Sequence, residues 1–200
     1  MVGSMENSKI KSYRRSFEKY DGGIQSLQWT SYKSAALRFA NLVKDVNLDN
    51  RSVLDVGCGF GDLVPFIASK TLHFEYTGVD LMNEFIAEAK KRYPEFEFKA
   101  ADFFSQSLGT FDIVFCSGAL NGKSENVIGD RKQKIKKMFR CANEALVFNM
   151  AGGFKATNLK SSQVYYADSL HILAYCMTLT PKIIFRHHYR KNDFTIVMYK

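Results

Sequence analysis

The sequence predicts an α/β fold in which a doubly wound, seven-stranded and mostly parallel sheet carries helices on both faces. Short apolar runs alternate with amphipathic stretches through residues 52–150, which is typical of parallel strands joined by helices. The first apolar run leads directly into closely spaced glycines, a pattern typical of a strand that ends beside a ligand. Two last apolar runs, 182–189 and 194–199, flank the polar turn 190–193, which predicts a β-hairpin and an antiparallel last strand.

Local patterns place each element. Residues 26–45 repeat apolar side chains at helical spacing with Thr30 or Ser31 as a cap, and Asp21-Gly22-Gly23 separates them from an aromatic-rich segment at 11–20. A helix after the second strand ends at Pro94, and Asp168 caps the last helix. The predicted strands are 52–56, 75–80, 96–100, 111–116, 145–150, 182–189 and 194–199, and two further predicted helices are 63–69 and the basic run 131–140.

Composition narrows the class of protein. The chain has 200 residues, a formal net charge of +8 and 46% hydrophobic residues, which predicts one folded domain and excludes disordered and fibrous classes. No apolar run has membrane-spanning length and no apolar segment opens the chain, so we expect a cytoplasmic protein with no membrane partner. Four scattered cysteines without a CxxC pair give no support to a metal site or a disulfide framework. The oligomeric state stays open.

The glycine-rich turn after the first strand discriminates between two classes of ligand. Val53–Leu63 places glycines at 57, 59 and 61, whereas a dinucleotide fingerprint requires one at 62. That position is Asp62, whose carboxylate would repel a pyrophosphate. A second acid, Asp55, precedes the first glycine by two residues, and an acid there suits a ligand that carries an ammonium group.

The run Val53–Leu63 resembles the first motif of the class I S-adenosylmethionine-dependent methyltransferases, and the chain is similar to their small, single-domain, type 11/12-like members. The later elements follow the order of that family, with Asp80 at the end of strand two, Asp102 after strand three and the antiparallel last strand. The resemblance implies a Rossmann-like domain at residues 51–200 that binds S-adenosylmethionine and releases S-adenosylhomocysteine (SAH). It leaves residues 1–50 as an N-terminal helical segment or lid, with 1–4 expected to be a cloning remnant.

The resemblance also implies roles for individual residues. Asp80 accepts from the ribose hydroxyls, Asp102 from the adenine amino group and Asp55 from the methionine ammonium. Each acid has a structural alternative: a solvated loop acid at 80, a cap before Ser105 at 102 and a turn-stabilising carboxylate at 55. Phe103 or Met82 flanks the adenine. The full set of expected cofactor-binding residues is Asp55, Gly57, Cys58, Gly59, Gly61, Asp80, Leu81, Met82, Ala101, Asp102, Phe103, Ser117 and Gly118.

The acceptor pocket is less well defined by the sequence. Ser117 and Gly118 follow strand four and are expected to face the sulfonium end of the cofactor. Further pocket candidates lie in the N-terminal segment and in the loop 151–168; they are Tyr13, Tyr20, Trp29, Tyr32, Arg38, Tyr165 and Tyr166. Packing is the alternative for each of them. No histidine lies next to a motif, so we name no catalytic acid or base.

These patterns predict methyl transfer to an O, N or C nucleophile of a small-molecule acceptor. After strand four the chain reads Cys116–Asn121, without the Asn/Asp-Pro-Pro-Tyr/Phe of amino-nitrogen methyltransferases and without a Pro-Cys nucleophile. One alternative is a methyltransferase that acts on RNA or protein, docked through the basic run 131–140. A second is a protein that holds the cofactor without transferring its methyl group.

Overall fold

The computed structural model describes residues 2–29, 31–157, 164–187 and 189–200, so Thr30, one of the two predicted caps, lies outside the described residues. The described elements, in chain order, are α1 (Val2–Tyr20), the 3₁₀-helix η1 (Ile24–Leu27), α2 (Tyr32–Leu42), β1 (Arg51–Val56), α3 (Val64–Ala68), β2 (Phe74–Asp80), α4 (Asn83–Arg92), β3 (Glu97–Ala100), β4 (Phe111–Ser117), the 3₁₀-helix η2 (Ala119–Asn121), α5 (Val127–Cys141), β5 (Ala142–Gly153), β6 (Ala167–Asp168), α6 (Ser169–Met177), β7 (Ile183–His187) and β8 (Asp193–Tyr199).

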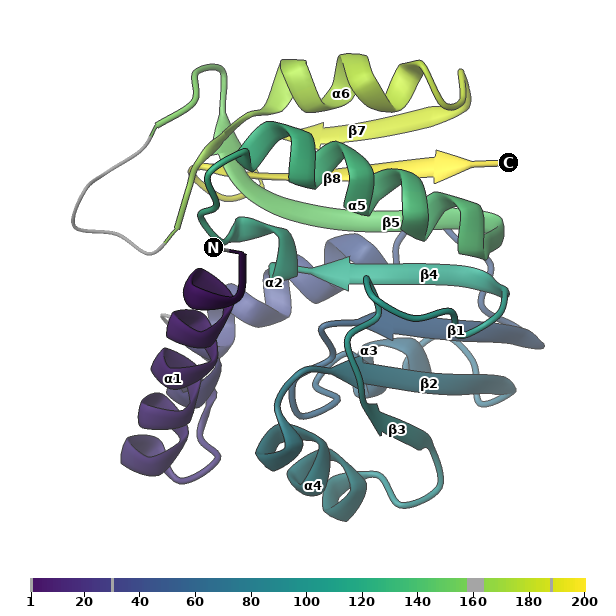
Figure 1. The fold of residues 1–200 in the computed structure, drawn as a ribbon. Coiled ribbons are helices and arrows are strands. Elements are labelled where there is room, and N and C mark those ends of the chain that lie inside the picture. The colour runs from purple at the N-terminus through teal and green to yellow at the C-terminus, as the bar shows by residue number, and fades with distance from the viewer. Residues whose placement is uncertain (1, 30, 158–163, 188) are drawn as a thin grey trace.

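The strands form one sheet in the order β3-β2-β1-β4-β5-β8-β7 (Figure 1). Strands β1 to β5 are parallel to one another, and β8 is antiparallel to both β5 and β7, which confirms the predicted hairpin. The seven strands of this path match the prediction, and the two-residue strand β6 adds an eighth that pairs with β5 beside the path. The fold is therefore the predicted mostly parallel α/β sheet.

Alternating side chains along the central strands build a core on each face of the sheet. Leu54 and Val114 point into one core, where α5 and α6 cover the sheet, and Val53 and Phe115 point into the other, under α2, α3 and α4. In Figure 1, α5 and α6 lie in front of the sheet and α2 and α3 behind it. Successive residues of a strand point to opposite faces of the sheet. A strand made of consecutive apolar residues therefore needs helices packed on both faces.

The prediction of one helix over 26–45 is wrong. Gln28 has a left-handed backbone (φ +59°), which ends η1 and separates it from α2. Ser31 then caps α2, because its side chain accepts a hydrogen bond from the Ser34 amide. The aromatic segment at 11–20 belongs to a longer helix than predicted, since α1 begins at Val2.

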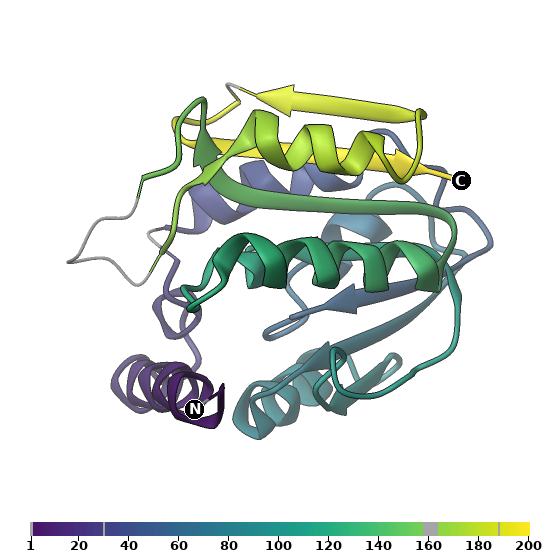
Figure 2. The ribbon, with the colours of Figure 1, turned by 45° about the horizontal axis from the view of Figure 1, so that its top comes forward.

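Helix α1 stands beside the carboxyl ends of the parallel strands and next to α4 (Figures 1 and 2). Its residues Tyr13 and Phe17 pack on a small cluster, Phe60, Met82 and Phe85, that is separate from the two main cores. Arg14 Nε donates to Glu84 Oε1 at 2.8 Å and ties α1 to α4. Among the described residues, no helix combines the length and apolar content that crossing a bilayer requires.

Candidate functional site

A cavity of about 970 Å³ opens at the carboxyl ends of β1, β2 and β4. Parallel strands end at a common edge, and ligands of open α/β sheets bind there. The structure describes all thirteen predicted cofactor-binding residues, and twelve of them line this cavity. Gly61 does not line it. A Cβ at Gly61 would lie 3.0 Å from the rings of Tyr93 and Phe98, so this glycine serves the packing behind the turn.

The turn after β1 requires glycine and is tied to the end of β2. Gly57 has φ +77°, and a Cβ there would lie 2.6 Å from the Cβ of Ala119. The amides of Gly57 and Cys58 both donate to the carbonyl of Val79, at 2.8 and 3.0 Å. These contacts fix the backbone of the turn at the edge of the cavity. Because Gly57 has no side chain, a ligand can approach this backbone closely.

Two backbone amides orient the Asp80 carboxylate at the end of β2. Gly59 N donates to Oδ2 at 3.1 Å and Met82 N donates to Oδ1 at 3.0 Å. A carboxylate oxygen accepts more than one hydrogen bond, so the Asp80 carboxylate can still accept hydrogen bonds from a ligand. A solvated loop acid would lack such fixed partners, which favours the predicted binding role.

Asp55 is a buried carboxylate, 2% exposed, on the wall of the same cavity. Tyr76 Oη donates to its Oδ2 at 2.8 Å, whereas Oδ1 has no hydrogen-bond partner among the described residues. Burial raises the pKa of Asp55 to about 7; the Tyr76 hydrogen bond opposes this rise, and the nearby charges of Asp80 and Asp62 add to it. A buried acceptor without a partner destabilises the protein unless a ligand supplies the donor.

Asp102 makes the local hydrogen bonds expected of a cap before Ser105, and it also lines the cavity. Its Oδ1 accepts from the Phe104 amide at 2.9 Å, and the Ser105 hydroxyl donates to its other oxygen. The neighbouring Phe103 and the facing Met82 are each 2% exposed and present apolar surface to the cavity. Asp102 thus shapes the loop after β3 whatever else it binds.

Lys137 holds the same loop from α5, a contact that sequence reasoning missed. Its Nζ donates to the carbonyls of Phe104 and Gln106, at 2.9 and 2.8 Å, and lies 5.3 Å from the centre of the Phe103 ring. Part of the basic run 131–140 therefore binds the protein itself and is not available as a docking surface. Arg131 is the clearest case, since it is 3% exposed and donates to the carbonyls of Leu120 and Tyr165. Burial lowers its pKa to about 10.

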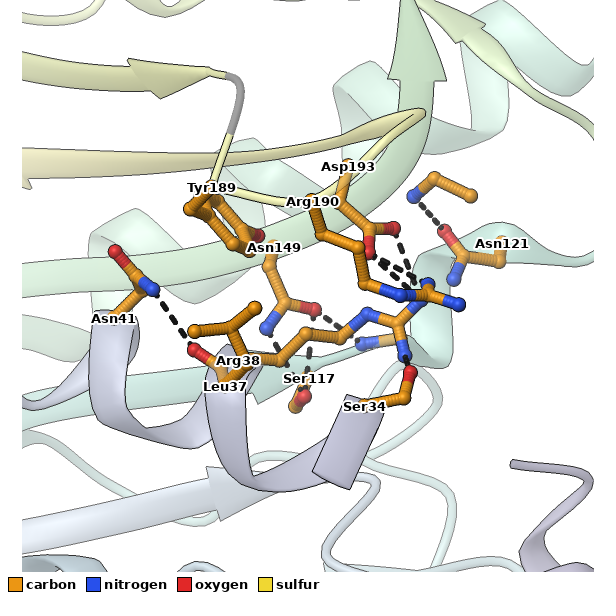
Figure 3. Close-up of polar contacts among 12 residues, drawn as sticks. Ser34, Leu37, Arg38, Asn41, Ser117, Asn121, Asn149, Tyr189, Arg190 and Asp193 are labelled. Atoms are coloured by element: carbon orange, nitrogen blue, oxygen red, sulfur yellow. Dashed lines mark hydrogen bonds and ion pairs between the residues drawn. The ribbon is translucent and has the colours of Figure 1, made fainter. Parts of the chain in front are cut away.

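At the end of β4, a buried asparagine fixes the backbone of the predicted acceptor region (Figure 3). The Gly118 amide donates to Asn149 Oδ1 at 3.0 Å, and Asn149 Nδ2 donates to Ser117 Oγ at 3.1 Å. Asn149 is 1% exposed and lies on β5, paired with Ser117. Sequence reasoning missed it, although a single amide in the apolar run 145–150 is the signal that could have found it.

Three of the five N-terminal pocket candidates line the cavity: Tyr13, Trp29 and Arg38. Burial, followed by the negative charge of Asp80, raises the pKa of Tyr13 to about 12. The other two candidates, Tyr20 and Tyr32, are 41% and 62% exposed and lie outside the lining.

The loop after β5 contributes to the wall through Val164 and Tyr166, and its residues 158–163 lie outside the described part of the chain. Tyr165 does not line the cavity. Its ring packs against the Arg131 guanidinium, whose Cζ lies 4.8 Å from the ring centre. No group of three or more His, Cys, Asp or Glu side chains in the described ranges is arranged to hold a metal ion.

Comparison with known proteins agrees with this architecture. Residues 53–144 match the family model described as methyltransferase domain. A protein of Mycobacterium tuberculosis named as a candidate methyltransferase is 26% identical over 160 residues, which cover 76% of this chain and 95% of that relative. Demethylmenaquinone methyltransferase of Thermotoga maritima is 28% identical over 120 residues, 58% of this chain and 52% of that enzyme, so the match spans about half of its length.

A solved structure extends the likeness to nearly the whole chain. DhpI in complex with SAH superimposes with a TM-score of 0.69 at 14% identity, covering 98% of this chain and 96% of DhpI. At this identity the likeness establishes a common fold, and the match includes the helices before β1 as well as the sheet.

Proposed function

We propose that this chain, whose residues 53–144 match a family model described as methyltransferase domain, uses S-adenosylmethionine to methylate an O, N or C nucleophile of a small-molecule acceptor. One observation carries the proposal. Oδ1 of the buried Asp55 has no partner among the described residues, and it lines a cavity beside a glycine turn and an oriented second acid. An ammonium group that enters this cavity supplies the missing donor.

The other residues of the cavity fit the remainder of that cofactor. Asp80, held by two backbone amides, would accept hydrogen bonds from the ribose hydroxyls. Phe103 and Met82 would enclose the adenine between apolar surfaces, with Asp102 at its edge. The backbone of Gly57 to Gly59 lies where the chain of the methionine moiety would pass.

The chain's contribution to transfer is placement and desolvation. S-adenosylmethionine, when bound, supplies a methyl group that is already activated for nucleophilic attack. Ser117 and Gly118, fixed by Asn149, border the region where an acceptor would lie, and a bound acceptor would displace water from it. No described histidine lines the cavity, so the proposal needs no imidazole base.

The name of one relative supports a small acceptor, since demethylmenaquinone methyltransferase is named for a small-molecule substrate. The contacts of Arg131 and Lys137 within the protein weaken the alternative in which α5 docks on RNA.

A calorimetric titration with SAH tests the proposal. We expect SAH to bind and to raise the melting temperature, because a ligand of the native state stabilises it. NAD is the matched control, since Asp62 occupies the position where a dinucleotide fingerprint has its third glycine. A titration that gives neither heat nor a thermal shift with SAH would remove the proposed function.

A further inference from the structure

Two arginines share one buried aspartate on the wall of the cavity (Figure 3). Arg38 Nη2 donates to Asp193 Oδ1 at 3.0 Å and Arg190 Nη1 donates to Oδ2 at 2.8 Å. The Asp193 side chain is 2% exposed, and those of Arg38 and Arg190 are 13% and 31% exposed. All three residues line the cavity, so a ligand in the cavity can reach them. We refer to Arg38, Arg190 and Asp193 as the arginine cluster.

The arginine cluster joins two guanidinium groups and one carboxylate, so its formal charge is +1, a surplus of one positive charge within the cluster. Lys191, the next residue along the hairpin turn, also lines the cavity and adds to the surplus. The lining has five other acids, Asp55, Asp62, Asp80, Asp102 and Asp130, and four further bases, Lys123, Arg131, Lys134 and Lys137. We call the part of the cavity formed by the arginine cluster and Lys191 its basic end.

The basic end lies close to the region where methyl transfer is proposed. The Arg38 guanidinium lies over the Trp29 ring, 4.7 Å from its centre. The same ring approaches within 3.8 Å of the position that a Cβ on Gly118 would occupy. One aromatic ring therefore separates Gly118 from the arginine cluster, a distance that a small molecule spans.

We propose, resting on the proposed function, that the acceptor carries an oxyanion, a carboxylate or a phosphate-type group, and that the arginine cluster binds it. Guanidinium groups present planar pairs of N–H donors that match such oxyanions. Arg38 is held by Asp193, Ser34 and Trp29, so it offers a fixed direction for binding. Arg190 is the more exposed of the two arginines, and with it the formal charge of the cluster is +1.

The single tryptophan of the chain reports on this site directly, because Trp29 lies against Arg38. We would follow its indole N–H signal by NMR while titrating phenyl phosphate, benzoate or neutral benzyl alcohol into the protein, with and without saturating SAH. We expect the two anions to bind more tightly than the alcohol and to lose affinity as salt increases. The relative affinities of phenyl phosphate and benzoate identify the preferred oxyanion.

Charge variants distinguish the cluster from the overall positive charge of the protein. Arg190→Gln leaves the neutral Arg38–Asp193 pair in place and should weaken anion binding roughly tenfold. Asp193→Asn raises the surplus and should strengthen it. Lys91→Gln removes an equal charge from an exposed site on α4, outside the cavity lining, and should leave anion affinity unchanged. Melting curves verify that each variant folds.

Three outcomes overturn the inference: anions that bind no better than benzyl alcohol, an Arg190→Gln variant with wild-type anion affinity, or a Lys91→Gln variant that weakens binding equally. Failure of SAH to bind would count against the proposed function instead. The titrations without SAH would still decide whether the arginine cluster binds oxyanions.

Discussion

The carboxylate of Asp55 destabilises the folded protein when it is charged. Its pKa of about 7 lies above the ordinary value of 3.8, so between these values the folded state binds more protons than the unfolded state. The contribution of Asp55 to stability therefore falls as pH rises from about 4 to 7 and stays at its lowest value above pH 7. The site retains an acid at a position where an uncharged residue would favour folding.

Asp55→Asn should consequently raise stability at pH 8 while it reduces SAH affinity. The amide oxygen can still accept from Tyr76, and the buried charge is gone. We expect a gain on the order of 2–4 kcal/mol in the free energy of unfolding at pH 8, which shrinks toward zero near pH 4, where the carboxyl also becomes protonated in the unfolded chain. Denaturant titrations at the two pH values measure it.

Asp112→Asn is the matched control with the opposite sign. The amide and hydroxyl of Ser52 donate to Asp112 and lower its pKa, so its charge stabilises the fold. That variant should be less stable than wild type at pH 8 and should bind SAH normally. If Asp55→Asn loses stability at pH 8, the carboxylate has a partner that the structure does not describe.

Asp80→Ala separates ligand binding from turn stability. Removal of a charged acceptor that is proposed to bind the ribose should weaken SAH binding by roughly one to two decades. The same change frees the amides of Gly59 and Met82, so a modest loss of melting temperature is also expected. Calorimetry and thermal melts measure the two effects on the same samples.

Asp80→Asn serves as its control, because an amide retains one acceptor oxygen and most of the volume. Its SAH affinity should lie between those of wild type and Asp80→Ala. Wild-type affinity in Asp80→Ala together with a collapse in stability would make Asp80 a structural residue only.

At the scale of elements, α1 is the part of the fold that the two main cores need least. Its contacts with Phe60, Met82 and Phe85 form a separate small cluster, and Gly22 and Asp21 after it have left-handed backbones. Two of its residues, Ile10 and Tyr13, line the cavity. This combination supports a segment that covers the cofactor and can move independently of the sheet.

Deletion of residues 1–23 should leave a folded protein that binds SAH about five- to tenfold more weakly, since contacts worth roughly 1 kcal/mol are lost from the cavity wall. In the full chain, limited proteolysis near Gly22 should slow when SAH is bound. Arg14→Gln removes only the exposed contact with Glu84 and should change the affinity little. Equal affinity in the deleted and full chains would show that α1 does not take part in binding.

For the whole molecule, the sequence predicts the middle of the chain well because each signal there is local. Alternating apolar residues define the strands, and the glycines of 57–61 mark the turn that a ligand approaches. The break of the predicted 26–45 helix at Gln28 was not predictable, since a left-handed glutamine has no sequence signature comparable to glycine's.

Long-range pairings account for most of what the sequence could not predict in the site. Arg38 and Asp193 are separated by 155 residues and meet only when α2 packs over the last strand. Asn149 and Ser117 face each other because β4 and β5 are paired in a particular register. Neither contact leaves a periodic or spaced pattern, so only the assembled fold reveals the arginine cluster.

The position of β8 between β5 and β7 has a consequence for the order in which the protein is built. During synthesis β7 emerges first, yet its partner in the sheet is β8, which follows it from the ribosome. A nascent chain that stops after β7 already contains β1, β2 and the glycine turn, and so the cofactor half of the cavity. It lacks Arg190 and Asp193 and therefore the basic end. The half proposed to hold the cofactor is therefore synthesised before the half proposed to bind the acceptor.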